Sequence, residues 1–381
     1  MSRTKTSGGL TKEIKIKRCY GCGAILQSDH KGQSGYILKS KLDSNEDQLC
    51  ERCFKLRHYS EDDGVPHFNE DYATILKKAQ EDQALIVLVT DAFSFEASLI
   101  PGIKQYLGKK LLLVVNKRDV LPKSYDDEKL LKLVKDRLDE EDIHPEEVLL
   151  LSTLNNYKFD KFNETLNRLR EGKDVYFIGV SQVGKSSIIN AFLKNYQNKT
   201  DKFITTSIYP GTTIDVIQIP VDNDSYFYDT PGIFNSHSII NNVERNILKY
   251  IIPKTEIKPI TYQSNAEQSY IIGSIARIDF ISGDKTNLKF FISERCEITR
   301  TKLKNAEKTF DSRCITQSAQ PASKLIKDTK DLYLTTLIAP KQGKTMLLIN
   351  GLCCVFFEAN GQKFDVYAPK NVEVKFLEGK F

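Results

Sequence analysis

The sequence predicts an α/β fold, a doubly wound and mainly parallel sheet, with a smaller unit on either side of it. Short apolar runs alternate with amphipathic stretches between residues 61 and 250, which is typical of strands that helices cover on both faces. Two Cys-x-x-Cys pairs lie before this region, within residues 19–58. After residue 250 strand patterns dominate and strong helical patterns are few, which predicts an α+β or mostly β domain.

The domain boundaries follow from these changes of pattern: 1–60, 61–250 and 251–381. The net charge of +5 does not by itself require a nucleic-acid partner. No apolar run approaches the ~20 residues of a membrane helix, and the N-terminus lacks the apolar core of a secretory signal. We therefore expect a cytoplasmic protein without a membrane partner and, because heptads are absent, a monomer.

Strand and helix patterns alternate along the middle domain. Its predicted strands are 84–90, 111–115, 148–151, 174–178, 214–221 and 225–228, and its predicted helices are 128–138, 163–170 and 186–196. In the last domain strands are predicted at 270–279, 288–292, 346–355 and 365–368.

The N-terminal region combines a basic segment with paired cysteines. Residues 1–18 are rich in Lys and Arg and hold one acid, Glu13, so the segment is either a disordered tail or an arm that contacts phosphates. Paired cysteines in a reducing compartment favour metal binding over disulfides, and four thiolates can hold a structural Zn²⁺. The long gap between the pairs leaves reduced structural cysteines or a redox pair as alternatives. The candidate zinc ligands are Cys19, Cys22, Cys50 and Cys53.

The most specific motif runs from Gly179 to Ser186 and matches G-x-x-x-x-G-K-[ST]. It lies between a predicted strand and a predicted helix, the context that a phosphate-binding loop requires. Its backbone N–H groups would surround the β-phosphate, Lys185 would pair with β- and γ-phosphate oxygens, and the Ser186 hydroxyl would bind Mg²⁺. The candidate phosphate contacts are Gly179, Gln182, Val183, Gly184, Lys185, Ser186 and Ser187.

Two weaker motifs follow the phosphate loop. In an Asp-Thr-Pro-Gly motif, Asp229 could hold Mg²⁺ through water and the Gly232 N–H could contact the γ-phosphate. In the segment 210–215, a threonine hydroxyl could bind Mg²⁺ only while the γ-phosphate is present. We favour Thr213 over Thr212 for this role, and a plain Pro-Gly turn is the alternative.

An Asn-Lys-Arg-Asp motif after an apolar strand pattern predicts that the base is guanine. The Asp119 carboxylate can accept hydrogen bonds from the ring N–H and the exocyclic amine. Adenine has neither donor at those positions, so ATP would leave a buried carboxylate unpaired. Asn116 and Lys117 would brace the base and the phosphate loop, and Ser152 or Thr153 could offer a backbone N–H to the guanine oxygen. The motifs together predict binding of GTP and GDP with Mg²⁺.

The guanine motif precedes the phosphate loop, the reverse of the usual order, and a circular permutation is the simplest account. In this order, behind an N-terminal four-cysteine module, the residues resemble the YqeH group of circularly permuted bacterial GTPases. The resemblance implies a GTPase that assists assembly of the small (30S) ribosomal subunit through rRNA or ribosomal-protein contacts. It rests on Cys19–Cys22, Cys50–Phe54, Asp91–Phe95, Asn116–Asp119, Gly179–Ser187, Pro210–Asp215, Asp229–Gly232 and Ala368–Lys370.

Two positions bear on the rate of hydrolysis. Ile233 stands where many small GTPases carry a water-orienting glutamine, and an apolar side chain cannot polarise water. Hydrolysis should therefore be slow without another group, ion or partner. Gln182 stands where related proteins commonly have an asparagine that helps bind K⁺, which puts K⁺ stimulation in doubt. The residues expected to act in the reaction are Lys185, Thr213, Asp229 and Gly232.

The last domain mixes basic and aromatic residues, a composition that suits RNA. The basic residues are Lys285, Lys289, Arg295, Arg300, Lys302 and Lys304, and the aromatic ones are Tyr270, Phe280, Phe290 and Phe291. Core packing is the more common role for such aromatics, and it is also expected for Cys296, Cys314, Cys353 and Cys354. Two other functions stay open: a nucleotide-gated RNA-binding scaffold with negligible turnover, and a GTPase that serves RNA modification.

Overall fold

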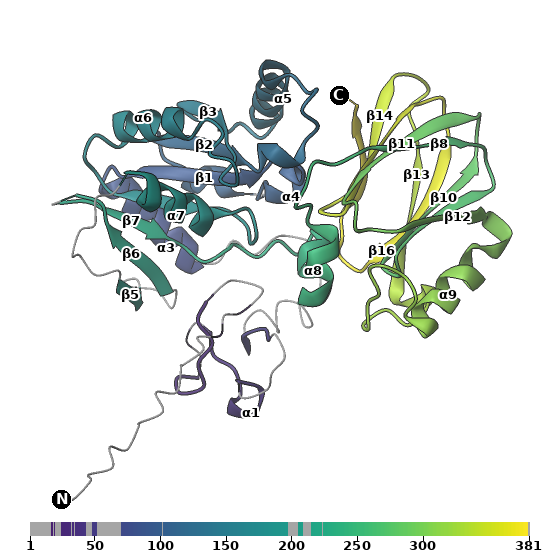
Figure 1. The fold of residues 1–381 in the computed structure, drawn as a ribbon, viewed down its shortest axis with the longest axis horizontal. Coiled ribbons are helices and arrows are strands. Elements are labelled where there is room, and N and C mark those ends of the chain that lie inside the picture. Colours follow the sequence, from purple (N-terminus) through teal and green to yellow (C-terminus); the bar gives the residue numbers. More distant parts are fainter. Residues whose placement is uncertain are drawn as a thin grey trace, which may run out of the picture.

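The computed structural model describes most of the chain from residue 70 onward and short stretches before it (Figure 1). The described residues are 17, 19, 24–31, 33, 35–42, 48–51, 70–100, 102–196, 205–208, 215–222 and 224–379. The predictions for residues 1–16, Cys22, Cys53, Thr212 and Thr213 fall outside them and stay predictions.

The middle domain is built on a seven-stranded sheet of order β3-β2-β1-β4-β7-β6-β5. The strands from β3 to β7 run parallel, whereas β6 and β5 are antiparallel to their neighbours. The predicted doubly wound, mainly parallel sheet is therefore confirmed. The strands are β1 (Leu85–Asp91), β2 (Leu111–Asn116), β3 (Glu147–Leu150), β4 (Val175–Ile178), β5 (Thr205–Ile208), β6 (Asp215–Pro220) and β7 (Tyr226–Asp229).

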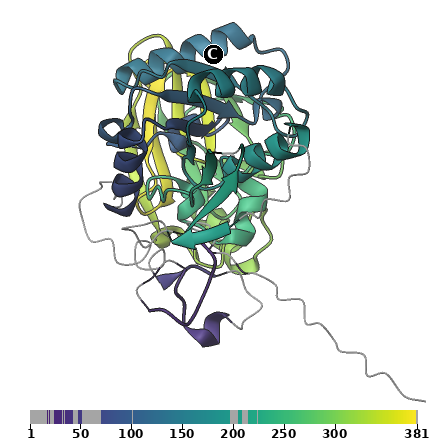
Figure 2. The same cartoon turned by 90° about the vertical axis from the view of Figure 1, so that its left-hand side faces the viewer.

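Helices lie on both sides of this sheet (Figures 1 and 2). Every residue of β1 and β2 is buried, because the apolar faces of the helices cover both strand faces. Asp126 caps α5 by accepting a hydrogen bond from the Lys129 N–H. The helices and 3₁₀ turns are α3 (Glu70–Glu81), α4 (Phe95–Ser98), η1 (Ile103–Tyr106), η2 (Arg118–Val120), α5 (Asp127–Glu140), α6 (Phe159–Arg170) and α7 (Lys185–Tyr196).

The last domain pairs two five-stranded antiparallel sheets around one apolar core, with orders β12-β9-β10-β16-β13 and β17-β14-β15-β11-β8. Of the two predicted alternatives, the mostly β domain is correct. The strands are β8 (Ile260–Ser264), β9 (Gln268–Ile272), β10 (Ala276–Ser282), β11 (Thr286–Ile292), β12 (Ile298–Lys302), β13 (Leu332–Ile338), β14 (Lys344–Ile349), β15 (Cys353–Glu358), β16 (Lys363–Pro369) and β17 (Val374–Glu378). Beside them lie η3 (Ile239–Asn241), α8 (Arg245–Ile251), η4 (Leu303–Asn305), α9 (Ala306–Thr316) and η5 (Thr329–Asp331).

Two predicted strands of this domain are in fact hairpins. The segment 270–279 turns at Gly273 between β9 and β10, and 346–355 turns at Gly351 between β14 and β15. Ser274 and Leu352, within these turns, are fully buried. The sequence carries turn residues at both places, Gly273-Ser274 and Asn350-Gly351, but the apolar residues around them made each pair of strands appear as one run.

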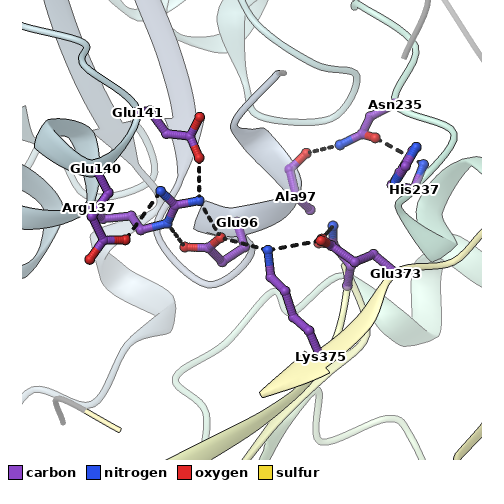
Figure 3. Close-up of polar contacts among 10 residues, drawn as sticks. Glu96, Ala97, Arg137, Glu140, Glu141, Asn235, His237, Glu373 and Lys375 are labelled. Carbon is purple, nitrogen blue, oxygen red and sulfur yellow. Dashed lines mark hydrogen bonds and ion pairs between the residues drawn. The ribbon is translucent and has the colours of Figure 1, made fainter. Parts of the chain in front are cut away.

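The two large cores divide between Ile233, which belongs to the first, and Ile239, which belongs to the second. Helix α8 contributes side chains to the second core, so residues before the predicted boundary at 251 already pack with the last domain. Backbone and amide hydrogen bonds hold the crossing segment (Figure 3). The Asn235 amide donates to the Ala97 carbonyl over 2.8 Å, and the Glu373 N–H donates to the His237 carbonyl over 2.9 Å.

An ion-pair chain joins the domains beside this segment (Figure 3). Glu96 of α4 accepts from Arg137 of α5 at 2.9 Å and lies 3.7 Å from the ammonium of Lys375 in β17. Lys375 also pairs with Glu373 at 3.0 Å. The short helix after β1 is therefore tied to the last domain.

The described N-terminal residues form a small cluster of their own around Cys19, Leu26, Ile37 and Cys50, with α1 (Lys39–Leu42) beside it. In the part of the chain that the structure describes, no helix has the length and apolar character needed to cross a lipid bilayer.

Candidate nucleotide-binding site

The predicted motifs meet at one edge of the seven-stranded sheet. The register places Asp91 beside Asn116 and Phe177 beside Asp229, so the carboxyl ends of β1, β2, β4 and β7 share this edge. A cavity of about 920 Å³ opens there. Of the predicted site residues it is lined by Lys117, Asp119, Thr153, Gln182, Gly184, Lys185, Ser186, Ser187, Asp229 and Gly232.

The phosphate loop lies between β4 and α7, as its motif predicts. The Lys185 ammonium is buried and donates to the carbonyls of Gly179 at 2.9 Å and Val180 at 3.1 Å. Burial lowers the pKa of Lys185 to about 8, although the Asp229 carboxylate opposes this shift. A phosphate entering the loop would supply the negative charge that this desolvated ammonium favours.

Gly184 lets the guanine motif brace this loop. Its φ is +99°, and a Cβ atom there would lie 2.4 Å from Nδ2 of Asn116. That amide donates to the Val183 carbonyl over 2.9 Å. The predicted brace between Asn116 and the phosphate loop is therefore formed, and Val183 takes part through its carbonyl while its side chain packs in the core.

Ser186 and Asp229 provide oxygen donors suited to Mg²⁺. The Ser186 hydroxyl donates to the Asp229 carboxylate over 2.5 Å. A hydroxyl and a carboxylate beside a phosphate site are ligands that Mg²⁺ accepts, so these residues fit the ion. Gly232 approaches Ser181 so closely that a Cβ would lie 2.4 Å from its Oγ. The next residue, Ile233, is buried and bonds through its N–H to the Gly179 carbonyl.

Local polar contacts hold the predicted guanine motif in place. Lys117 has a left-handed conformation with φ of +64°, and its ammonium pairs with Asp91 at 2.5 Å. Asp91 also accepts from the N–H groups of Phe93 and Ser94. This arrangement leaves the Asp119 side chain half-buried on the cavity wall.

The loop after β3 assigns unequal roles to the two residues predicted there. Ser152 is fully buried, and its N–H donates to the Tyr157 carbonyl over 3.3 Å. Thr153 and Leu154 line the cavity instead. Thr153 is therefore the better placed of the two to offer a backbone N–H to the guanine oxygen.

Sequence reasoning missed lining residues in three places. Ser181 belongs to the phosphate loop, and Lys254 lies on the connector after α8. The connector reaches the cavity because the Ile257 N–H donates to the Val120 carbonyl over 2.8 Å. Cys19 also lines the cavity, from the N-terminal cluster. No local pattern marks the connector or Cys19 as close to the nucleotide.

Half of the predicted zinc set lies within the described residues. The Cys50 N–H donates to the Cys19 sulfur over 3.2 Å, and both cysteines are buried. Two cysteines from distant pairs thus lie together, as a shared metal would require. Among the described residues no cluster of three or more His, Cys, Asp or Glu could hold a metal.

The aromatic residues suggested as RNA-stacking groups in the last domain are core residues instead. Tyr270, Phe280 and Phe290 are fully buried, and Phe291 is 6% exposed. Buried rings cannot stack on bases, so that part of the hypothesis is wrong, and the more common role applies. The six basic side chains of this region are exposed. Cys296, Cys314 and Cys353 are buried, and burial raises the pKa of the Cys296 thiol to about 12.

Comparison with known proteins agrees with this geometry. Residues 174–273 match the family described as "50S ribosome-binding GTPase", and residues 285–379 match "YqeH-like, C-terminal". A Bacillus subtilis (strain 168) protein, "Uncharacterized protein YqeH", is 36% identical over 93% of this chain and 97% of its own length. The chain belongs to the YqeH-like GTPase family.

One more distant relative of this YqeH-like GTPase is a longer protein. "NO-associated protein 1, chloroplastic/mitochondrial" of Arabidopsis thaliana is 25% identical over 77% of this chain but only 60% of its own length. The crystal structure of YjeQ from Thermotoga maritima is 22% identical and covers 40% of this chain and 49% of its own, with a TM-score of 0.25.

Proposed function

We propose that the protein is a GTP-binding and GTP-hydrolysing switch that assists assembly of the small ribosomal subunit. One observation carries the proposal: a single cavity is lined by the phosphate loop with Lys185, the Ser186–Asp229 pair and the guanine-reading Asp119. Family membership supports GTP hydrolysis. A circular permutation would account for the order in which these motifs occur along the chain.

Catalysis would rest on charge placed around the phosphates. Lys185 would pair with β- and γ-phosphate oxygens, Ser186, Thr213 and Asp229 would hold Mg²⁺, and the Gly232 N–H would contact the γ-phosphate. Mg²⁺ would neutralise charge that develops on the phosphates. Since Ile233 is buried and apolar, no side chain at that position can orient water, so turnover without a partner should be slow. Turnover measured in KCl and in NaCl decides whether K⁺ stimulates hydrolysis in place of the missing water-orienting side chain.

The ribosomal partner is identified by an experiment that tests the two subunits separately. The description of the matching family names the large (50S) subunit, whereas the resemblance of the motifs implies the small one. Exposed Lys and Arg of the last domain are suited to rRNA phosphates. Sedimentation with each purified subunit in GTP and in GDP should show GTP-dependent binding to the small subunit. Binding to the large subunit alone would contradict the proposal.

Single-turnover hydrolysis separates the switch from its alternatives. The expected result is slow hydrolysis alone and faster hydrolysis with small subunits. GTP binding without turnover in either condition would favour a nucleotide-gated RNA-binding scaffold. A hydrolysis rate that neither ribosomal subunit changes would favour a GTPase of another process, such as RNA modification. Zinc measured on the same sample should be near one ion per chain if Cys19, Cys22, Cys50 and Cys53 form a structural site.

Loss of the γ-phosphate is expected to act on the last domain through the segment after Gly232. Ile233 is hydrogen-bonded to the phosphate loop. Further along the same segment, Asn235 is hydrogen-bonded to α4 and His237 to Glu373. Amide hydrogen exchange should therefore differ between GDP and a GTP analogue around residues 233–260. Equal exchange there, with a difference confined to residues 179–187, would show that the phosphate signal stops at the loop.

A further inference from the structure

The Asp127 carboxylate joins the two loops that would hold guanine, although it does not line the cavity itself. It is the first residue of α5, and its side chain is 18% exposed. One oxygen accepts from Nε of Arg118 over 2.8 Å. The other accepts from the Tyr157 hydroxyl and the Lys158 ammonium, each at 2.5 Å. Three donors from two separate loops therefore converge on one carboxylate.

Arg118 connects this carboxylate to the guanine motif. It immediately precedes Asp119, is 8% exposed, and donates from its backbone N–H to the Leu151 carbonyl over 2.9 Å. Its guanidinium also donates to carbonyls of the turn that follows, at Leu121, Pro122 and Tyr125. The Arg118 side chain thus fixes the turn that follows Asp119, and its backbone N–H ties the motif to the end of β3, while Arg118 itself does not line the cavity.

Tyr157 and Lys158 connect the same carboxylate to the loop after β3. Tyr157 exchanges backbone hydrogen bonds with Ser152, at 3.0 and 3.3 Å, and so closes the loop that presents Thr153 to the cavity. Lys158 follows in a left-handed conformation, with φ of +54°, and is the N-cap residue of α6. Holding these two side chains holds the position of Thr153.

The charge state of the carboxylate suits this role. Burial disfavours the charge, but hydrogen bonds from Lys158, Tyr157 and Arg118 outweigh burial and lower the pKa of Asp127 to about 2. Asp127 is therefore ionised throughout the neutral range. Its bonds to Arg118 and Lys158 are charge-assisted, and such bonds are stronger and geometrically stricter than neutral ones.

We propose that Asp127 is a positioning residue for guanine recognition, which clamps the Asp119 loop and the Thr153 loop at a fixed separation. The proposal rests on the proposed nucleotide site. A bidentate contact from Asp119 to guanine tolerates only small displacements, because both hydrogen bonds must form together. Weakening the clamp should therefore weaken the hydrogen bond from the exocyclic amine of guanine to Asp119 most. Hypoxanthine lacks that amine, so the effect is measured as a change in the ratio of the affinities for GDP and IDP.

The test is Asp127→Asn, which keeps the shape of the side chain and removes its charge. Calorimetry should show GDP affinity about tenfold weaker, with the affinity for IDP changed less, so the GDP-to-IDP ratio narrows several-fold. Tyr157→Phe removes one of the three bonds and should give a smaller narrowing. The matched control is Glu147→Gln, because Glu147 of β3 pairs with Arg168 and Lys161 away from both loops. The control should leave the ratio unchanged.

A purely structural role gives a different result. If Asp127→Asn lowers the melting temperature but keeps the wild-type GDP-to-IDP ratio, the clamp does not position the base and the proposal is overturned. If Asp127→Asn does not fold, an unchanged ratio in Tyr157→Phe overturns it. Asp119→Asn in the same assay tests the pocket itself. If the wild type binds GDP and Asp119→Asn loses it, the nucleotide site stands whatever Asp127 does. If the wild type binds neither nucleotide, both proposals fail.

Discussion

Asp119→Asn should exchange the guanine preference of the protein for a xanthine preference. The Asp119 carboxylate lies half-buried on the cavity wall, where it can accept from the guanine ring N–H and amine. An amide offers a donor in place of one acceptor, which suits the additional carbonyl of xanthine. We expect GDP affinity to fall by about a hundredfold or more and XDP affinity to rise above it, since an unpaired polar contact in a closed site is costly.

Calorimetry with GDP, XDP and ADP measures this exchange. Glu164→Gln is the control, because Glu164 is exposed on α6 outside the cavity and undergoes a comparable loss of charge. Its affinities should match those of the wild type. Wild-type protein that binds ADP as tightly as GDP, or an Asp119→Asn variant that gains nothing toward XDP, would mean that this carboxylate does not contact the base.

Lys185→Met should abolish binding of both GDP and GTP. The buried ammonium already occupies the centre of the phosphate loop, held by two backbone carbonyls. Its loss leaves the phosphates without a desolvated cationic partner, and breaking such a pair costs about 3–5 kcal/mol, a factor above about a hundred in affinity. Lys194→Met in the last turn of α7, where the side chain is exposed, is the control. GDP binding by Lys185→Met that is as tight as binding by the wild type would place the phosphates elsewhere.

The pH dependence of binding follows from the same lysine. Because burial lowers the pKa of Lys185 to about 8, the free protein carries this charge at neutral pH and loses it above pH 8. If the charged form binds, GDP affinity should fall by up to about tenfold per pH unit above 8, and binding at pH 9 should take up a proton. Calorimetry in two buffers of different ionisation enthalpy measures that uptake. Equal proton uptake at pH 7 and pH 9 would contradict it.

Stability should change with pH in the opposite direction. The folded-state pKa lies below the value of 10.5 for an unperturbed lysine, so the unfolded chain binds more protons between pH 8 and pH 10.5. The charged, buried Lys185 therefore costs stability at neutral pH, and this cost declines as the pH rises through that range. Lys185→Met should remove this dependence.

The parts of the site that sequence alone predicted are those whose chemistry depends on short local spacing. A phosphate loop needs its glycines, Lys185 and Ser186 within one turn between a strand and a helix, and parallel strands bring the other motifs to the same edge. Ser152 was overrated because its N–H is taken by Tyr157, a local loop closure that no pattern announces. Lys254 was missed because its approach depends on a single long-range bond, from Ile257 to Val120.

The fold of the last domain was harder to predict for a related reason. The turns at Gly273 and Gly351 are buried between apolar strands, so each pair of strands appeared as one run although Asn350-Gly351 is a typical hairpin turn. Helix α9 buries only Ala306, Phe310 and Cys314, which is too few apolar positions for a clear helical period. The aromatic residues that suggested RNA contacts were filling the space between two sheets.

The chain segments before and after helix α8 are bonded to different parts of the candidate nucleotide site. The chain before it includes Ile233, which is bonded to the phosphate loop, and the chain after it includes Ile257, which is bonded to Val120 next to Asp119. Cleavage of the terminal phosphate would release only the attachment at Ile233. The last domain should then rotate about the attachment at Val120 instead of moving away as a whole, because the Glu96–Lys375 ion pair and the Ile257–Val120 hydrogen bond do not depend on the terminal phosphate.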